Sequence, residues 1–169
     1  MTKSQFVEQL KNPKLWLTFV LIAVLLWSFA FYWIAQPTKS EKLVIWLAGD
    51  FQLKTKIKDK IFSAVEPFGI KVVNAKSYNP NDAYFPQAFS LQAHSVDIYI
   101  LTKDFAQTVH QTQLFRQMMQ FDGATYLQFD QQNYGIHFVG DYYIFINATS
   151  KQSDDVLRSA IAVLISEAQ

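Results

Sequence analysis

The residues best suited to bind a ligand follow three apolar runs that predict buried strands. Loops at the carboxyl ends of parallel strands are the usual ligand sites of α/β sheets. Glycine and aspartate also serve turns and helix starts at such places, so a structural role is the alternative for each residue. The candidates are Gly49, Asp50 and Phe51 after residues 43–48, Tyr78 in the loop after residues 70–74, and Thr102 and Asp104 after residues 96–101.

Aromatic side chains offer a second kind of recognition. They make up 16% of the chain, and their flat faces can stack on a sugar or fill a partner's pocket. Trp46 lies within a predicted buried strand, where core packing is its expected role. Tyr84 and Phe85 stand in an otherwise polar loop, and we expect them, more than Trp46, to contact a ligand or a partner.

The sequence lacks the residue patterns typical of catalytic and metal-binding sites. His94, His110 and His137 are scattered without the spacing of metal ligands, and the chain has no cysteine. The sequence has no glycine-rich phosphate loop, no nucleophile elbow and no close pair of carboxylates on a predicted element. We therefore expect no metal, no cofactor and no catalytic residue. A cell-envelope hydrolase that uses Asp50, Asp104 or a histidine is the less favoured alternative.

The balance of charge limits the partners. The chain carries 15 basic and 14 acidic residues, a formal charge of +1. Nucleic-acid binding normally needs a net positive field, which this balance does not supply. We expect no nucleic acid among the partners.

A transmembrane helix is predicted at residues 15–35, which include no charged side chain. About 21 helical residues span the roughly 30 Å hydrocarbon layer of a lipid bilayer. The residues before this segment are more basic than acidic, so the positive-inside rule predicts that residues 1–14 are cytoplasmic and that the domain is extracytoplasmic, at the cell membrane. The side chains expected at the two membrane interfaces are Lys14 and Trp16 at one and Tyr32 and Trp33 at the other.

Cleavage of this segment as a signal peptide is the alternative. A signal peptide has a shorter apolar core, and the small-x-small pattern at residues 28–30 lies inside the apolar run rather than after it. A core helix that is apolar on every face is out of proportion to so small a domain. We therefore favour an uncleaved single-pass anchor.

The elements that position the candidates form one domain over residues 42–169, after a polar linker at residues 36–41. Strands alternating with helices in the first half predict parallel pairing, and the short turns of the second half predict antiparallel pairing. We expect an α/β fold in three layers with a mixed sheet. Strands are predicted at residues 43–48, 70–74, 96–101, 126–129, 135–139 and 142–147, and helices at residues 53–68, 87–93 and 103–119 and from residue 154.

The order of these elements resembles one lobe of the extracellular solute-binding proteins of ABC importers, particularly the sugar-type class. Residues 43–46, 68–72 and 95–101 look like the first strand, the "gikv" strand and the "vDiyil" strand of that family, and residues 140–147 look like its returning strand. The resemblance implies a periplasmic-binding-protein-like fold.

The chain differs from that family in two ways. It has room for one lobe only, and its tether is a helix. Members of the family are typically more than twice as long and clamp a ligand between two lobes. Half a clamp binds a small ligand weakly unless another chain supplies the second wall. The resemblance therefore implies a non-catalytic accessory or interaction subunit of a membrane protein complex, for example one with an ABC transporter permease. Low-affinity binding of a small solute such as a sugar is the alternative.

Overall fold

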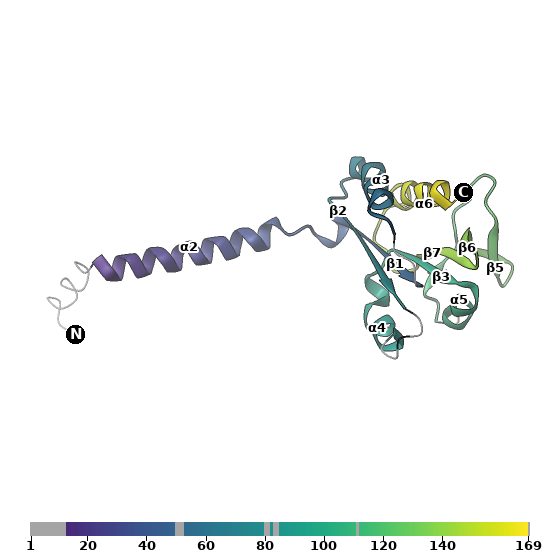
Figure 1. The fold of residues 1–169 in the computed structure, drawn as a ribbon, viewed down its shortest axis with the longest axis horizontal. Helices are drawn as coiled ribbons and strands as arrows, with labels where there is room; N and C mark the ends of the chain where they lie inside the picture. The colour runs from purple at the N-terminus through teal and green to yellow at the C-terminus, as the bar shows by residue number, and fades with distance from the viewer. Residues whose placement is uncertain (1–12, 50–52, 80–81, 83–84, 111, 169) are drawn as a thin grey trace. The chain divides into compact units, whose positions relative to one another are not determined.

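The computed structural model describes residues 13–49, 53–79, 82, 85–110 and 112–168 (Figure 1). The chain forms two units, Met1–Gln36 and Pro37–Gln169. The described residues of the first form an apolar helix, and those of the second form a sheet with helices on both of its faces.

The helix α2 (Pro13–Ala35) has 23 residues, which gives a length of about 34 Å. Its mean hydropathy reaches 2.2, and none of its residues is buried. The helix stops two residues before Pro37. By length and composition, α2 can span a membrane.

In the second unit, the described residues form a mixed sheet of seven strands. Their order is β2-β1-β3-β7-β6-β5, and β4 pairs with β7. The strand β1 runs parallel to β2 and β3, whereas β7 is antiparallel to β3, β4 and β6, and β5 is antiparallel to β6. The strands are β1 (Lys42–Ala48), β2 (Val72–Tyr78), β3 (Ile98–Thr102), β4 (Phe115–Arg116), β5 (Tyr126–Phe129), β6 (Gln132–Val139) and β7 (Tyr142–Asn147).

Helices cover both faces of this sheet. Figure 1 shows α3 (Thr55–Val65) and α6 (Asp154–Ala168) on one face, and α4 (Phe85–Gln92) and α5 (Lys103–His110) on the other. Short 3₁₀ helices precede β1, follow α3 and follow α4; they are η1 (Lys39–Glu41), η2 (Glu66–Phe68) and η3 (Ala93–Ser95). The expectation of an α/β domain with a mixed sheet behind one apolar helix is confirmed.

Alternation along β1 divides the core into two parts. Leu43, Ile45 and Leu47 belong to the cluster that packs under α3 and α6. Trp46 and Ala48 belong to the cluster on the opposite face, under α4 and α5. Because a strand buried on both faces has no solvent-facing side, its sequence is a continuous apolar run rather than an alternating one.

Three predicted elements differ in extent from the structure. The strand predicted at residues 135–139 is β6, which begins at Gln132. The helix predicted at residues 103–119 ends at His110, and a left-handed Gln113 turns the chain so that Leu114 and Phe115 become buried against the sheet. The second strand, predicted at residues 70–74, is β2 and continues to Tyr78, because its backbone pairs with all seven residues of β1. Backbone pairing at a sheet edge requires no apolar side chains. The second half of this strand is polar, and its sequence therefore predicts a loop.

Candidate functional site

The candidates at the carboxyl ends of β1 and β3 have structural roles where the structure describes them. Gly49 donates its amide to the Tyr78 carbonyl at 2.9 Å, and a Cβ at Gly49 would lie 2.6 Å from the hydroxyl of Tyr142. Thr102 accepts the Phe105 amide at 3.4 Å on its hydroxyl, at the start of α5. The exposed Asp104 lies in the first turn of α5, where a negative charge favours the helix dipole. Asp50 and Phe51 lie outside the described residues.

The aromatic candidates belong to a core cluster on the α4 face. Trp46 is 1% exposed and packs against Tyr78 and Phe89, with ring centroids 4.3 and 5.4 Å away. The expectation that Phe85 lies in a polar loop is wrong, because α4 begins at Phe85 and its side chain is 3% exposed beside Trp46. Tyr84 lies outside the described residues. The described aromatic residues of this group therefore stabilise the domain by packing.

The sequence did not indicate a pocket at the opposite, amino-terminal ends of the parallel strands. Its volume is about 270 Å³. Four segments meet there, namely η1 with the start of β1, the middle of β2, η3 with the start of β3, and the loop from β7 to α6. We call it the lysine pocket; its lining residues are Lys39, Lys42, Val44, Trp46, Asn74, Lys76, Gln92, His94, Ser95, Val96, Asp97, Thr149, Ser150, Lys151 and Gln152.

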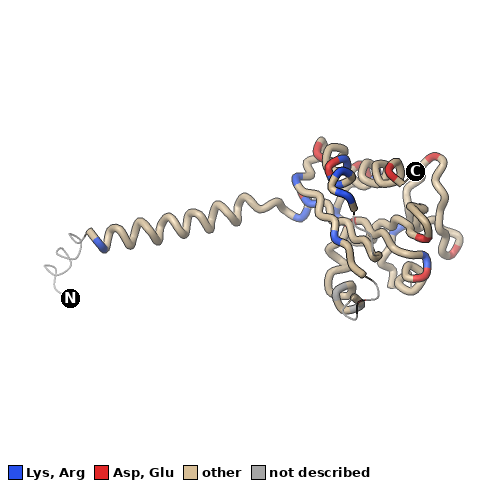
Figure 2. Tube along the Cα trace, in the orientation of Figure 1, with Lys and Arg blue, Asp and Glu red and all other residues tan. Residues whose placement is uncertain are grey.

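The charged side chains that line the lysine pocket are mostly basic. Lys39, Lys42, Lys76 and Lys151 contribute four positive charges, against the single carboxylate of Asp97. Within the described part of the chain, none of these four lysines forms an ion pair. Basic residues lie along η1 and the start of β1, where the second unit begins (Figure 2). An anionic ligand would therefore meet lysines that have no competing carboxylate partner.

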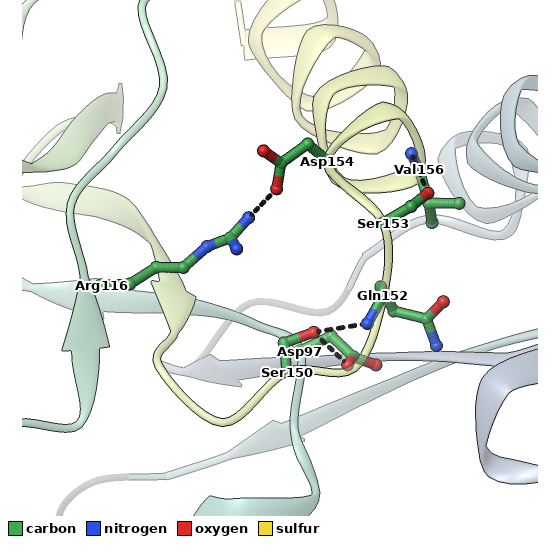
Figure 3. A network of polar contacts seen from close by, with 7 residues as sticks. All are labelled: Asp97, Arg116, Ser150, Gln152, Ser153, Asp154 and Val156. Atoms are coloured by element: carbon green, nitrogen blue, oxygen red, sulfur yellow. Dashed lines mark hydrogen bonds and ion pairs between the residues drawn. The ribbon is translucent and has the colours of Figure 1, made fainter.

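Asp97 is buried and turned toward donors of the protein itself. One carboxylate oxygen accepts the Val44 amide at 2.9 Å, and the other accepts the Ser150 hydroxyl at 2.6 Å. The Ser150 hydroxyl in turn accepts the Gln152 amide at 3.3 Å (Figure 3). Burial raises the pKa of Asp97, while its hydrogen bonds to Ser150 and Val44 oppose that rise. Both oxygens are thus occupied, and Asp97 joins β1 to the loop that carries Lys151.

The loop between β7 and α6 is fixed at its carboxyl end, where α6 begins. The Gln152 side chain, 8% exposed, donates to the carbonyls of Lys42 at 2.8 Å and Lys39 at 3.3 Å. At the start of α6, Arg116 pairs with Asp154 at 2.6 Å, and the Ser153 hydroxyl accepts an amide of the first helical turn (Figure 3). These bonds hold the backbone at Lys39, Lys42 and Lys151 in one arrangement.

Asn147 fixes another wall of the lysine pocket. Its side chain is completely buried and donates to the carbonyls of Ala93 at 2.7 Å and Val96 at 2.6 Å, the two residues that flank the turn of η3. Its side-chain oxygen accepts the Thr149 amide at 2.9 Å. Asp97 and Asn147 are polar residues within or beside apolar runs, and that is the one sequence signal that could have drawn attention to this end of the sheet.

Metal ligation finds no support among the described residues, which contain no group of three or more His, Asp or Glu side chains able to hold an ion. His94 lines the lysine pocket. His110 stacks on Phe129 and lies 3.5 Å from an Asp130 oxygen, and His137 is bonded to the Gly140 carbonyl at 2.9 Å. The three histidines therefore occupy separate surroundings.

Comparison of the chain with models of known protein families gives no match, and comparison with characterised protein sequences gives none either.

Proposed function

We propose that this protein is a membrane-anchored, extracytoplasmic accessory subunit that binds beside a membrane protein complex and carries out no catalysis itself. The observation that carries the proposal is an apolar helix of membrane-spanning length followed, after residues 36–38, by the first turn of a compact α/β unit. Three residues reach at most about 11 Å, so the tether limits how far the domain can act from the bilayer.

The topology of the sheet supports a single-lobe domain. The first three strands pair in parallel in the order β2-β1-β3, and β7 returns antiparallel beside β3. This arrangement agrees with the element order on which the resemblance to one lobe of a solute-binding protein rests. A single lobe supplies one wall of a clamp, and a partner such as an ABC transporter permease would supply the other surface.

Gentle-detergent purification of the tagged full-length chain tests this proposal. The matched control carries an unrelated single-span helix in place of residues 1–36, so that it stays in the membrane with the same domain. We expect a multi-span membrane protein to co-purify stoichiometrically with both chains. Co-purification with the native helix alone would assign binding to α2, and purification of both chains without a partner would overturn the accessory-subunit proposal.

Direct binding of a small solute is the second candidate, because the lysine pocket is a hollow in which lysine and other polar side chains line the wall beside apolar ones. A ligand that binds only the folded state raises the unfolding temperature in a saturable way. We expect at least one member of a panel of sugars, amino acids and phosphate esters to raise it. A flat response to the whole panel would exclude this candidate and leave the accessory-subunit proposal untouched.

A further inference from the structure

We propose that the lysine pocket binds the phosphate group of a small anionic ligand. This inference rests on the second candidate function, direct solute binding, and names the chemical class of the solute. It is independent of the resemblance to solute-binding proteins, because the pocket lies at the end of the sheet opposite to the strand-end loops expected to bind a ligand.

The charge of the lining selects an anion. Lys39, Lys42, Lys76 and Lys151 come from three separate segments of the chain and line one pocket. Lysine ammonium groups bind phosphate as point charges with rotatable donors. Like charges gathered around a pocket repel one another, and a bound dianion would relieve that repulsion.

The pocket does not supply an acidic group that would repel such a ligand strongly. Asp97 is the single lining carboxylate, and its oxygens face the Val44 amide and the Ser150 hydroxyl. Burial raises the pKa of this carboxyl, which disfavours its charged form. The side chains of Asn74 and His94 add further polar groups to the lining.

The size of the pocket restricts the ligand to a small group. Sites for drug-sized molecules begin at roughly 300 Å³, and the lysine pocket measures about 270 Å³. A phosphate with a short polar or aliphatic substituent is the appropriate size. Val44, which is half-buried, supplies an apolar contact for such a substituent.

Two sources offer this chemistry. A soluble phosphate ester could diffuse into the pocket, or the phosphate of an anionic lipid could enter it from a bilayer surface, since Lys39 and Lys42 follow the end of α2 by four and seven residues. Both present the same phosphate to the same lysines, and only the test separates them.

Trp46 provides a direct readout. The four tryptophans of the chain are Trp16, Trp27 and Trp33 in α2 and Trp46 in the pocket lining. A full-length chain with Trp16→Phe, Trp27→Phe and Trp33→Phe therefore reports from the pocket alone. In uncharged detergent micelles, it is titrated with glycerol 3-phosphate, with glycerol as the uncharged control. In a second arm the micelles receive phosphatidylglycerol, with phosphatidylcholine as the control.

We expect a saturable change in Trp46 emission with glycerol 3-phosphate, with phosphatidylglycerol or with both, and none with either control. A response to glycerol 3-phosphate alone identifies a soluble ligand, and a response to phosphatidylglycerol alone identifies a lipid headgroup. The apparent affinity should fall when salt rises from low to high concentration, because salt screens exposed charges.

Pocket variants localise the site. Lys76→Gln with Lys151→Gln replaces two exposed lysines of the lining, and we expect the dissociation constant to rise about tenfold or more. Lys103→Gln is the control, because Lys103 is also exposed but lies outside the pocket. An unchanged unfolding temperature of each free variant shows that it is folded.

Absence of a response to both anionic probes, or a response that the double variant leaves intact, would overturn the phosphate proposal. If a neutral solute of the panel then still stabilises the chain, solute binding stands and only the ligand class is wrong. If no solute stabilises it, solute binding fails as well.

Discussion

The two ends of the parallel strands are built in different ways. At the carboxyl ends, the described residues complete turns and helix starts, as Gly49 does beneath Tyr142 and Thr102 does ahead of α5. At the amino-terminal ends, buried polar side chains bond segments that lie more than fifty residues apart, as Asp97 does with Val44 and Ser150. The lysine pocket lies at this second end.

This difference shows where side-chain hydrogen bonds replace apolar packing. A buried polar side chain must be bonded to offset its lost hydration, so Asp97 and Asn147 each fix a particular arrangement of neighbouring loops. Variants at the two ends should therefore differ both in the size of their effect and in its dependence on pH.

The largest effect is expected from Asn147→Ala. It removes the donor of two buried carbonyls, those of Ala93 and Val96, and should lower the free energy of unfolding by about 3 kcal/mol. Chemical denaturation of the chain in detergent measures the loss. Asn133→Ala, which removes a half-buried amide bonded to the exposed Gln128, is the control and should cost far less. Equal losses for the two variants would mean that Asn147 has no special role in holding η3.

Two substitutions of Asp97 separate its hydrogen bonds from its charge. Asp97→Ala leaves the Val44 amide without its acceptor and should cost about 2 kcal/mol. Asp97→Asn keeps an acceptor for that amide and a donor toward Ser150, so it should cost much less. Because burial raises the pKa of Asp97 above 3.8 in the folded state, the stabilising contribution of this group is complete below pH 3.8 and is lost as pH rises through the folded-state pKa.

The stability of the wild-type chain relative to Asp97→Asn should accordingly be greatest near pH 3.8 and should decline toward neutral pH. Denaturation of both chains across this range measures the difference. A difference that is constant with pH, or that grows toward neutral pH, would contradict the raised pKa.

A substitution at the carboxyl ends of the parallel strands should lower the free energy of unfolding less than those at the amino-terminal ends. Gly49→Ala places a methyl group 2.6 Å from the Tyr142 hydroxyl, and displacement of that ring should cost about 1 kcal/mol. In a chain that already carries Tyr142→Leu, the added cost of Gly49→Ala should be smaller, because the obstructing hydroxyl and ring are gone. If the free-energy costs of the two substitutions are additive, the close approach of Tyr142 to residue 49 does not require glycine.

The smallest effect is expected at the start of the domain, from Glu41→Gln. Glu41 pairs with Lys71 and accepts the Thr38 amide at 2.8 Å. The hydrogen bonds from Lys71 and Thr38 lower the pKa of Glu41 from 4.5 to about 2. This lowered pKa gives a stabilising contribution that is present above pH 4.5 and is lost as pH falls toward 2. The unfolding temperature of the variant should therefore converge on that of the wild-type chain at acid pH, and a gap that persists there would refute the assignment.

Much of the fold follows from the sequence because apolar patterns determine burial. The run at residues 43–48 predicts β1, and the strands at residues 126–129 and 142–147 have the predicted bounds. The length of β2 and the end of α5 do not follow, since the first depends on pairing with β1 and the second on a left-handed turn at Gln113.

The candidate site was less predictable, because long-range contacts create it. Lys42, Lys76 and Lys151 lie far apart in the sequence and line one pocket only after the sheet and the β7 to α6 loop have formed. The general preference for the carboxyl ends of strands gave no indication of this pocket. Buried polar residues such as Asn147 hold its walls, and their partners are backbone carbonyls that no side-chain motif reveals.

Membrane topology provides the most direct test of the anchored-domain account. The chain has no cysteine, so Ser4→Cys and Ser63→Cys each create a single labelling site, one before α2 and one on the exposed surface of α3. Both are treated with a membrane-impermeant maleimide before and after permeabilisation of the cytoplasmic membrane, and the label is measured in the membrane fraction. The account predicts that Ser63→Cys is labelled in intact cells and that Ser4→Cys is labelled only after permeabilisation. The reverse pattern, or a domain released from the membrane without α2, would contradict it.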